Sequence, residues 1–92
     1  MDAADAWRKY FENWPTDIDR RGVVVTSFDE QILFDGFATN SDMVLLERRT
    51  PDTVGARMVL LTYQNIQAVK IVDVLKLKNF QSLGFVSPPP RK

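Results

Sequence analysis

The fold of this 92-residue chain is decided by one stretch, Gln31-Ile32-Leu33-Phe34-Asp35-Gly36-Phe37-Ala38-Thr39. Apolar residues on both sides of Gly36 are typical of a strand, and a glycine inside a strand pattern indicates a bulge, a sharp bend or close approach of another backbone. If Phe34 and Ala38 face the core, Leu33 and Phe37 face the other way and need a cover. The stretch therefore predicts a bent strand whose second face also carries large apolar side chains.

Four more apolar runs flank this strand, and this region shows almost no helical periodicity. They are Val23–Phe28, Met43–Arg49, Arg57–Tyr63 and Ala68–Val74. About five strands are too few to bury two separate sheets, so we expect one small, strongly bent antiparallel barrel. The third and fourth of these runs are apolar on both faces. In so small a barrel, this pattern indicates cover by another chain.

The N-terminal segment is predicted to be a helix over residues 3–14. It carries four aromatic residues at helical spacing, namely Trp7, Tyr10, Phe11 and Trp14. Asp2 and Asp5 suit the positive end of the helix, and Pro15 disfavours helical geometry at the residue before it. The aromatic stripe could serve a membrane surface or a partner, but we expect it to form a lid on the sheet.

The domain organisation is expected to be simple, because 92 residues suffice for one domain. We expect a single domain over residues 1–87, with the barrel at 22–74 and an extension at 75–87. In the extension, Leu75–Lys78 could continue a strand, or the residues around Phe80 could form a short helix. Residues 88–92 belong to a proline-rich tail that we expect to be disordered and polyproline-like.

Composition restricts the chemistry that this chain can perform. The absence of cysteine and histidine excludes disulfides, thiolate zinc sites and cysteine nucleophiles. No nucleophile–base motif, glycine-rich phosphate loop or metal-ligand spacing is present. We therefore expect no enzyme activity, cofactor, bound metal or small-molecule substrate. With no long apolar run and no signal peptide, we expect a cytoplasmic protein without membrane contact.

The two motifs of the strand region resemble those of the Sm-like proteins, the family of Sm, LSm and bacterial Hfq. The first is Gln31–Thr39 followed by Asp42 and Val44-Leu45-Leu46, and the second is Met58–Ile66 followed by Val69. The resemblance covers roughly Trp7 to Val74. It implies a barrel that joins copies of itself into a homo-oligomeric ring through its last two strands. The subunit interface would then involve Met58, Leu60, Leu61, Val69 and Ile71.

The same resemblance implies a site for single-stranded RNA at the ring pore. The loop after the second strand and the turn after the fourth would supply Asn40, Ser41, Asp42, Met43, Tyr63, Gln64 and Asn65. An aromatic ring can stack a base and amides can read its edge. Hydrogen-bonded turn chemistry is the other interpretation of Gln64 and Asn65. Arg48, Arg49 and Arg57 could contact phosphate or simply be solvated strand ends.

A structural or protein-interaction ring without RNA binding is the alternative function. The turn Tyr63-Gln64-Asn65-Ile66 has no counterpart of the basic residue that usually follows the fourth strand in this family. Charge also favours this alternative, because residues 22–75 carry seven acidic and four basic side chains. Residues 76–92 carry four basic and no acidic side chains. Nucleic-acid affinity depends largely on neutralised phosphates.

Overall fold

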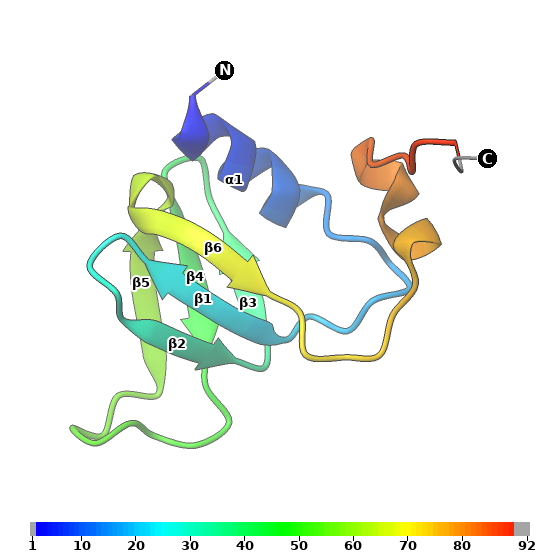
Figure 1. Ribbon diagram of the computed structural model, residues 1–92. Coiled ribbons are helices and arrows are strands. Elements are labelled where there is room, and N and C mark those ends of the chain that lie inside the picture. The colour runs from blue at the N-terminus through cyan, green and yellow to red at the C-terminus, as the bar shows by residue number, and fades with distance from the viewer. Residues whose placement is uncertain (1, 90–92) are drawn as a thin grey trace.

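A computed structural model describes residues 2–89 of the chain. One helix, α1 (Ala3–Glu12), precedes six short strands and two 3-10 segments. The strands are β1 (Gly22–Thr26), β2 (Gln31–Phe34), β3 (Phe37–Thr39), β4 (Met43–Glu47), β5 (Met58–Thr62) and β6 (Ile66–Lys70). The 3-10 segments are η1 (Tyr63–Asn65) and η2 (Leu77–Leu83). Figure 1 shows α1 lying across one end of the strands, and the C-terminal segment standing to one side of them.

The strands form two antiparallel sheets of three strands each, in the orders β2-β1-β6 and β3-β4-β5. The chain passes from one sheet to the other at Asp35-Gly36, where β2 gives way to β3. Hydrogen bonds continue through this bend, because Asp35 N donates to Glu47 O at 2.8 Å and Glu47 N donates to Gly36 O at 2.9 Å. The predicted sharp bend near Gly36 is therefore confirmed.

The predicted small, strongly bent antiparallel architecture takes the form of two three-stranded sheets, and no closed barrel is found within residues 2–89. The turn η1 leads the chain from β5 to β6, but β6 then pairs with β1 and not with β5. Both β5 and β6 are consequently edge strands with no backbone partner on their outer side within residues 2–89. The last strand also ends at Lys70 and not at Val74.

The core lies between the inner faces of the two sheets and is capped by α1. Val24, Ile32, Val44, Leu46 and Leu61 are buried there. Phe34 and Phe37 both point into this core, with ring centroids 6.1 Å apart. The predicted facing of Phe37 is therefore wrong: the bend places an extra residue between β2 and β3 and shifts the alternation of side chains. Leu33, predicted to need a cover, stays exposed.

The aromatic stripe of α1 forms the predicted lid. Asp2 is the N-cap that precedes α1, and its carboxylate accepts a hydrogen bond of 2.9 Å from Asp5 N. Phe11 and Trp14 are buried, and the Trp14 indole donates to Ile18 O at 3.1 Å. The indole N–H thus keeps a partner inside the core.

The C-terminal segment takes the helical alternative, since residues 77–83 form η2. Two polar contacts tie this segment to the connector between α1 and β1. Arg21 Nε donates to Asp73 Oδ1 at 2.9 Å, and Asn79 Nδ2 donates to Asp17 Oδ2 at 2.7 Å. Pro88 and Pro89 are exposed outside any regular element, whereas the rest of the predicted tail, residues 90–92, lies outside the described residues.

Glycine is required sterically at Gly22. A Cβ atom added there would lie 2.6 Å from Lys70 O on the paired strand β6, whereas one added at Gly36 would meet only the flexible Glu47 carboxylate at 3.3 Å. We expect Gly22→Ala to lower the free energy of unfolding by about 1–3 kcal/mol through overpacking. Urea unfolding followed by circular dichroism measures the change. Gly36→Ala is the matched control, and equal losses in both variants would contradict the close approach of β1 and β6.

Candidate functional site

The structure divides the RNA-binding candidates between the two ends of the β4–β5 hairpin. One group comprises the β3–β4 loop and the turn η1, next to α1. The other comprises Arg48, Arg49 and Arg57, at the opposite end of the same strands. The Arg48 N–H donates to Arg57 O at 2.9 Å, which holds that end together. The two groups therefore do not form one site within a single subunit.

The loops of the first group are joined by a side chain that crosses between them. The Tyr63 hydroxyl donates to Asn40 O at 3.1 Å. The ring of Tyr63 is only 2% exposed and packs in the core beside Phe11. Burial raises the pKa of the Tyr63 hydroxyl, Glu12 raises it further, and Arg8 opposes the shift. In this position Tyr63 ties the loops together, and its ring is not available for stacking on a base.

The remaining loop residues differ in how far their side chains are already used. Asn40 Oδ1 accepts from Asp42 N at 2.8 Å and from Met43 N at 2.7 Å, so this side chain shapes the loop. Asn65 donates from Nδ2 to Thr62 Oγ1 at 2.9 Å, in accordance with turn chemistry. Gln64 is exposed, and its side chain forms no hydrogen bond within residues 2–89. Gln64 is therefore the amide best placed to meet a ligand.

These loops border a polar pocket of about 330 Å³ to which α1 also contributes. Ser41, Asp42, Thr62, Tyr63 and Gln64 line one side, and Ala4, Asp5 and Arg8 line the other. Arg8 lies 3.6 Å from Asp5 Oδ1 and 3.6 Å from Glu12 Oε1. Exposed ion pairs of this kind contribute about 0.3–0.5 kcal/mol each, so a phosphate could displace either carboxylate.

Arg8 is a candidate that the sequence interpretation missed. From the sequence alone, Arg8 is expected to lie on a solvent-exposed face of the helix. Whether it comes close to η1 depends on how α1 packs on the sheets, which the sequence does not give. The spacing could have given a partial signal, since Arg8 follows Trp7 and precedes Tyr10 and so borders the stripe that packs on the sheet.

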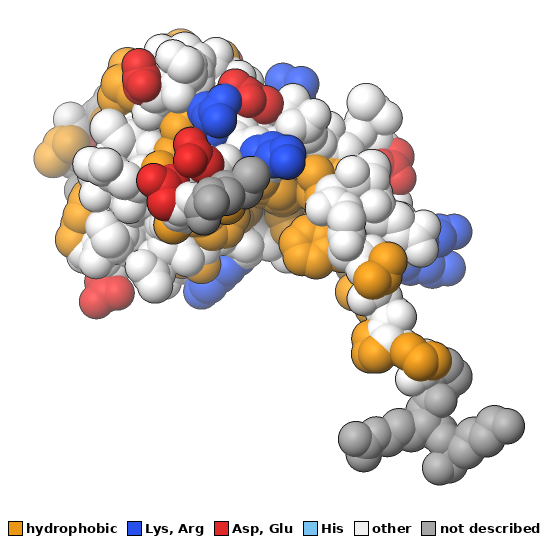
Figure 2. All heavy atoms as spheres, turned by 90° about the horizontal axis from the view of Figure 1, so that it is seen from above, with side chains coloured by type: hydrophobic (Ala, Val, Ile, Leu, Met, Phe, Trp, Pro, Cys, Tyr) orange, Lys and Arg blue, Asp and Glu red, His pale blue; other side chains and the backbone are white. Residues whose placement is uncertain are grey.

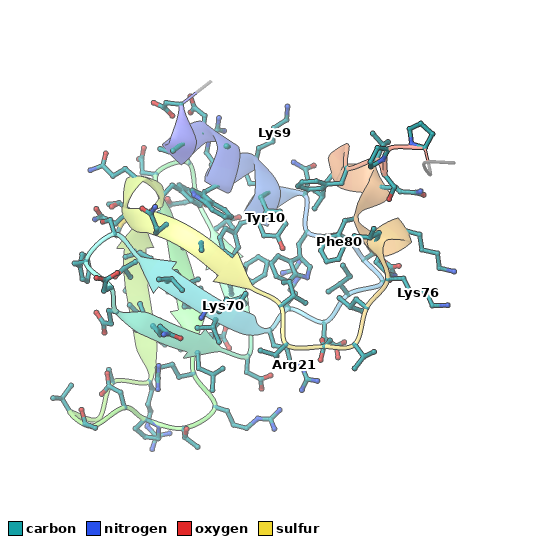
Figure 3. All side chains as sticks on the ribbon, in the orientation of Figure 1. Lys9, Tyr10, Arg21, Lys70, Lys76 and Phe80 are labelled. Carbon is teal, nitrogen blue, oxygen red and sulfur yellow. The ribbon has the colours of Figure 1, made fainter. Side chains whose placement is uncertain are left out.

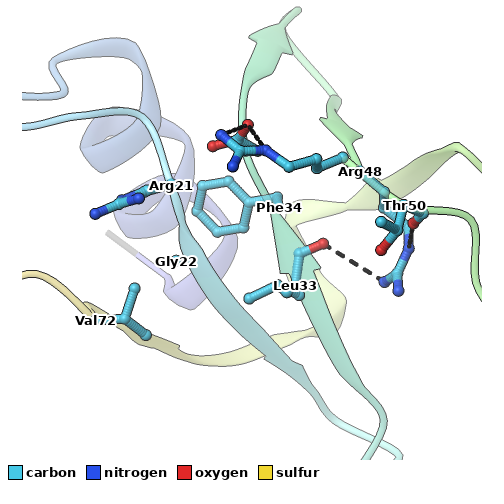
Figure 4. A pocket seen from close by; sticks show the side chains of 9 residues that line it. Arg21, Gly22, Leu33, Phe34, Arg48, Thr50 and Val72 are labelled. Atoms are coloured by element: carbon cyan, nitrogen blue, oxygen red, sulfur yellow. Dashed lines mark hydrogen bonds and ion pairs between the residues drawn. The ribbon is translucent and has the colours of Figure 1, made fainter.

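Arg48 and Arg49 of the arginine group at the other end have side-chain partners in their own chain, whereas Arg57 contributes only its backbone carbonyl within residues 2–89. Arg49 donates from Nε and Nη2 to Asp35 Oδ2 at 3.0 and 2.8 Å. Arg48 donates to Thr50 O at 3.3 Å, and a longer contact of 3.5 Å reaches Leu33 O. Figure 4 shows these contacts around a cavity of about 170 Å³, with Arg21 and Phe34 on its other side. The arginines chiefly organise the ends of β2 and β4.

The residues proposed for a subunit interface lie on the two edge strands and just beyond β6. Met58 and Leu60 point outward and are 59% and 62% exposed. Val69 and Ile71 are half-buried and pack against the core. Leu61 is buried and faces the core of its own subunit. Of the β5 residues, Met58 and Leu60 are therefore the two whose apolar surface remains free.

Comparisons with family models, curated proteins and solved structures gave no match to this chain. None of the helices within residues 2–89 is long and apolar enough to cross a membrane.

Proposed function

We propose that this chain is an Sm-like ring subunit, which joins copies of itself by pairing β5 of one subunit with β6 of the next. The observation that carries the proposal is the pair of unpartnered edges on β5 and β6 within residues 2–89. The two strands have equal lengths of five residues each. An exposed edge is a template for pairing with another chain, and natural monomers usually block such edges.

The outward face of the β3-β4-β5 sheet supports this proposal. Ala38, Leu45 and Leu60 are direct cross-strand neighbours on that face. Met58 and Leu60 extend the apolar surface up to the free edge of β5. A contiguous apolar surface beside an open edge favours burial against another subunit.

The proposed contact joins two different surfaces, so it is heterologous. Heterologous contacts close into rings when the rotation between subunits closes, and otherwise they continue as filaments. Light scattering after size exclusion, with native mass spectrometry, tests the proposal directly. A single discrete stoichiometry is expected. A monomer at tens of micromolar, or a broad distribution of growing species, would rule out the ring.

Single-stranded RNA is the second candidate function, as a ligand of the loop face. The position of Arg8 favours it. This chain lacks the basic residue that usually follows the fourth strand in Sm-like proteins. Arg8 brings a guanidinium to the same pocket from α1. Repetition around a ring would multiply a weak contact by avidity. Without RNA binding, the ring remains a structural or protein-interaction assembly.

The RNA candidate predicts a specific effect of Arg8→Gln. Uridine-rich and adenine-rich oligomers are titrated with the assembled protein by fluorescence polarisation at several salt concentrations. Arg8→Gln is expected to weaken binding and to lower the slope of log K against log salt by about 0.7 for each phosphate that the variant no longer neutralises. Arg57→Gln tests the candidates at the other end of the hairpin in the same way, and Lys78→Gln, an exposed cation of η2, is the control. Absence of saturable binding at low salt would remove RNA as a ligand and leave the ring itself untouched.

A further inference from the structure

A groove of about 890 Å³ lies between α1, the end of β6 and the C-terminal segment. Its walls carry four aromatic residues, with Trp7 and Tyr10 on α1, Phe80 on η2 and Phe85 beyond it. Figure 3 shows the Tyr10 and Phe80 side chains on facing sides of the gap between α1 and η2. Neither the edge strand β5 nor the loop pocket beside Arg8 contributes to this groove.

The polar atoms of the aromatic walls are hydrogen-bond donors that lack partners. Neither Tyr10 Oη nor Trp7 Nε1 takes part in a hydrogen bond within residues 2–89, whereas the buried Trp14 indole does. Burial raises the pKa of Tyr10 to about 12, so its phenol stays protonated at neutral pH and can donate. A fitting ligand would therefore be apolar and would offer acceptors.

A proline-rich segment has this chemistry. Proline contributes a carbonyl acceptor but no N–H, and the polyproline II conformation is largely formed before binding. Grooves lined with aromatic side chains recognise such segments. This chain carries one itself, Ser87-Pro88-Pro89-Pro90-Arg91-Lys92. We propose that the groove beside Tyr10 and Phe80 binds the proline-rich tail, residues 87–92, of a second copy of the chain.

The occupant is a second copy because of where the tail begins. Phe85 lies on the groove wall, so Ser87 starts only two residues from the rim. Figure 2 shows the last described residues of the C-terminal segment leading away from the globule. Residues 87–89 are exposed. Residues 87–89 thus start outside their own groove, where a neighbouring copy can reach them.

The charged residue that lines the groove is Lys9, a cation like Arg91 and Lys92 of the tail, so the contact rests on the aromatic walls and their donors and not on opposite charges. The groove includes Val69 and Ile71 at the end of β6 but no residue of β5, so a β5 variant separates the groove contact from the proposed ring.

A labelled peptide with the sequence of residues 86–92 tests the contact. The acceptor is the full chain with Pro88, Pro89 and Pro90 replaced by Ala, so that its own tail cannot compete. Fluorescence polarisation is expected to show saturable binding, and a peptide with the same three replacements is expected not to bind. Tyr10→Phe keeps the aromatic side chain but removes its hydroxyl donor. Loss of one hydrogen bond of about 1 kcal/mol is expected to weaken peptide binding about fivefold. Leu60→Asp in the acceptor is expected to leave the affinity unchanged, which separates this contact from ring assembly.

Four results would overturn the proposal. The first is absence of saturable binding, and the second is equal affinities of the acceptor with and without Tyr10→Phe. The third is that the wild-type chain excludes the labelled peptide equally well at low and at high protein concentration, because the tail would then occupy the groove of its own chain. The fourth is an apolar dye in the groove that the peptide cannot displace, because the groove would then favour small apolar ligands.

Discussion

Leu60→Asp is expected to convert the proposed ring into folded monomers. Leu60 is 62% exposed at the free edge of β5, so an aspartate there is solvated in the isolated subunit. In a β5–β6 contact the same carboxylate would be buried without a partner, at a cost of about 3 kcal/mol or more, which weakens each contact more than a hundredfold. The replacement also places a charge on an edge strand, which is how natural sheets block pairing.

The measurement is mass by light scattering, with circular dichroism to show that the monomer remains folded. Val54→Asp is the matched control, since Val54 is an exposed apolar residue of the β4–β5 loop away from both edges. An unchanged oligomer mass in Leu60→Asp would remove β5 from the interface. Met58→Asp tests the same edge at a second position on the same face.

Phe11→Ala is expected to have the largest effect on stability. Phe11 is 1% exposed, and its ring lies 5.0 Å from that of Phe37 and 5.9 Å from that of Trp14. Removal of such a ring leaves a cavity and costs about 3–5 kcal/mol. A domain of this size has a total stability of about 5–14 kcal/mol, so at least about a fifth of it is lost. The midpoint of thermal unfolding should fall by about 15–30 °C.

Phe28→Ala separates this effect from a general loss of aromatic side chains. Phe28 is 61% exposed in the turn after β1, so the same substitution removes little packing there. Both variants are compared by thermal and urea unfolding at one protein concentration, because assembly makes the midpoint depend on concentration. A Phe11→Ala variant within about 1 kcal/mol of the parent would show that α1 is not part of the core.

The sequence predicted the parts of the fold that depend on local spacing. The helix and the bend near Gly36 follow from periodicity and glycine placement, and both are found; of the two candidate residues at the positive end of the helix, Asp2 is the N-cap, and the helix ends at Glu12, two residues before the predicted end. The facing of Phe37 could not be read the same way. Strand alternation is a rule for unbroken strands, and the extra residue at the bend reverses which face Phe37 occupies.

The candidate site was less predictable because its geometry is tertiary. The resemblance places Tyr63 among residues that face RNA, yet its ring fills the core and only its hydroxyl reaches the loop at Asn40. Arg8 shows the reverse case. It is distant in sequence from Gln64 but lines the same pocket, because the aromatic face of α1 seats the helix over η1. The absence of a closed barrel within residues 2–89 has a similar origin. The pairing of β6 with β1 depends on contacts between segments that lie far apart in the chain.

That long-range pairing also sets the order in which the molecule can be completed during its synthesis. β1 lies between β2 and β6, and only β2 follows it closely in the chain. The three consecutive valines Val23, Val24 and Val25 therefore leave the ribosome with one side open until Ile66–Lys70 emerges. Segments of high β-propensity without charge are aggregation-prone while unpaired. The nascent chain is thus most prone to aggregation after the β1–β2 hairpin has been synthesised and before β6 has emerged. A chaperone that binds unpaired strands would have its largest effect in this interval.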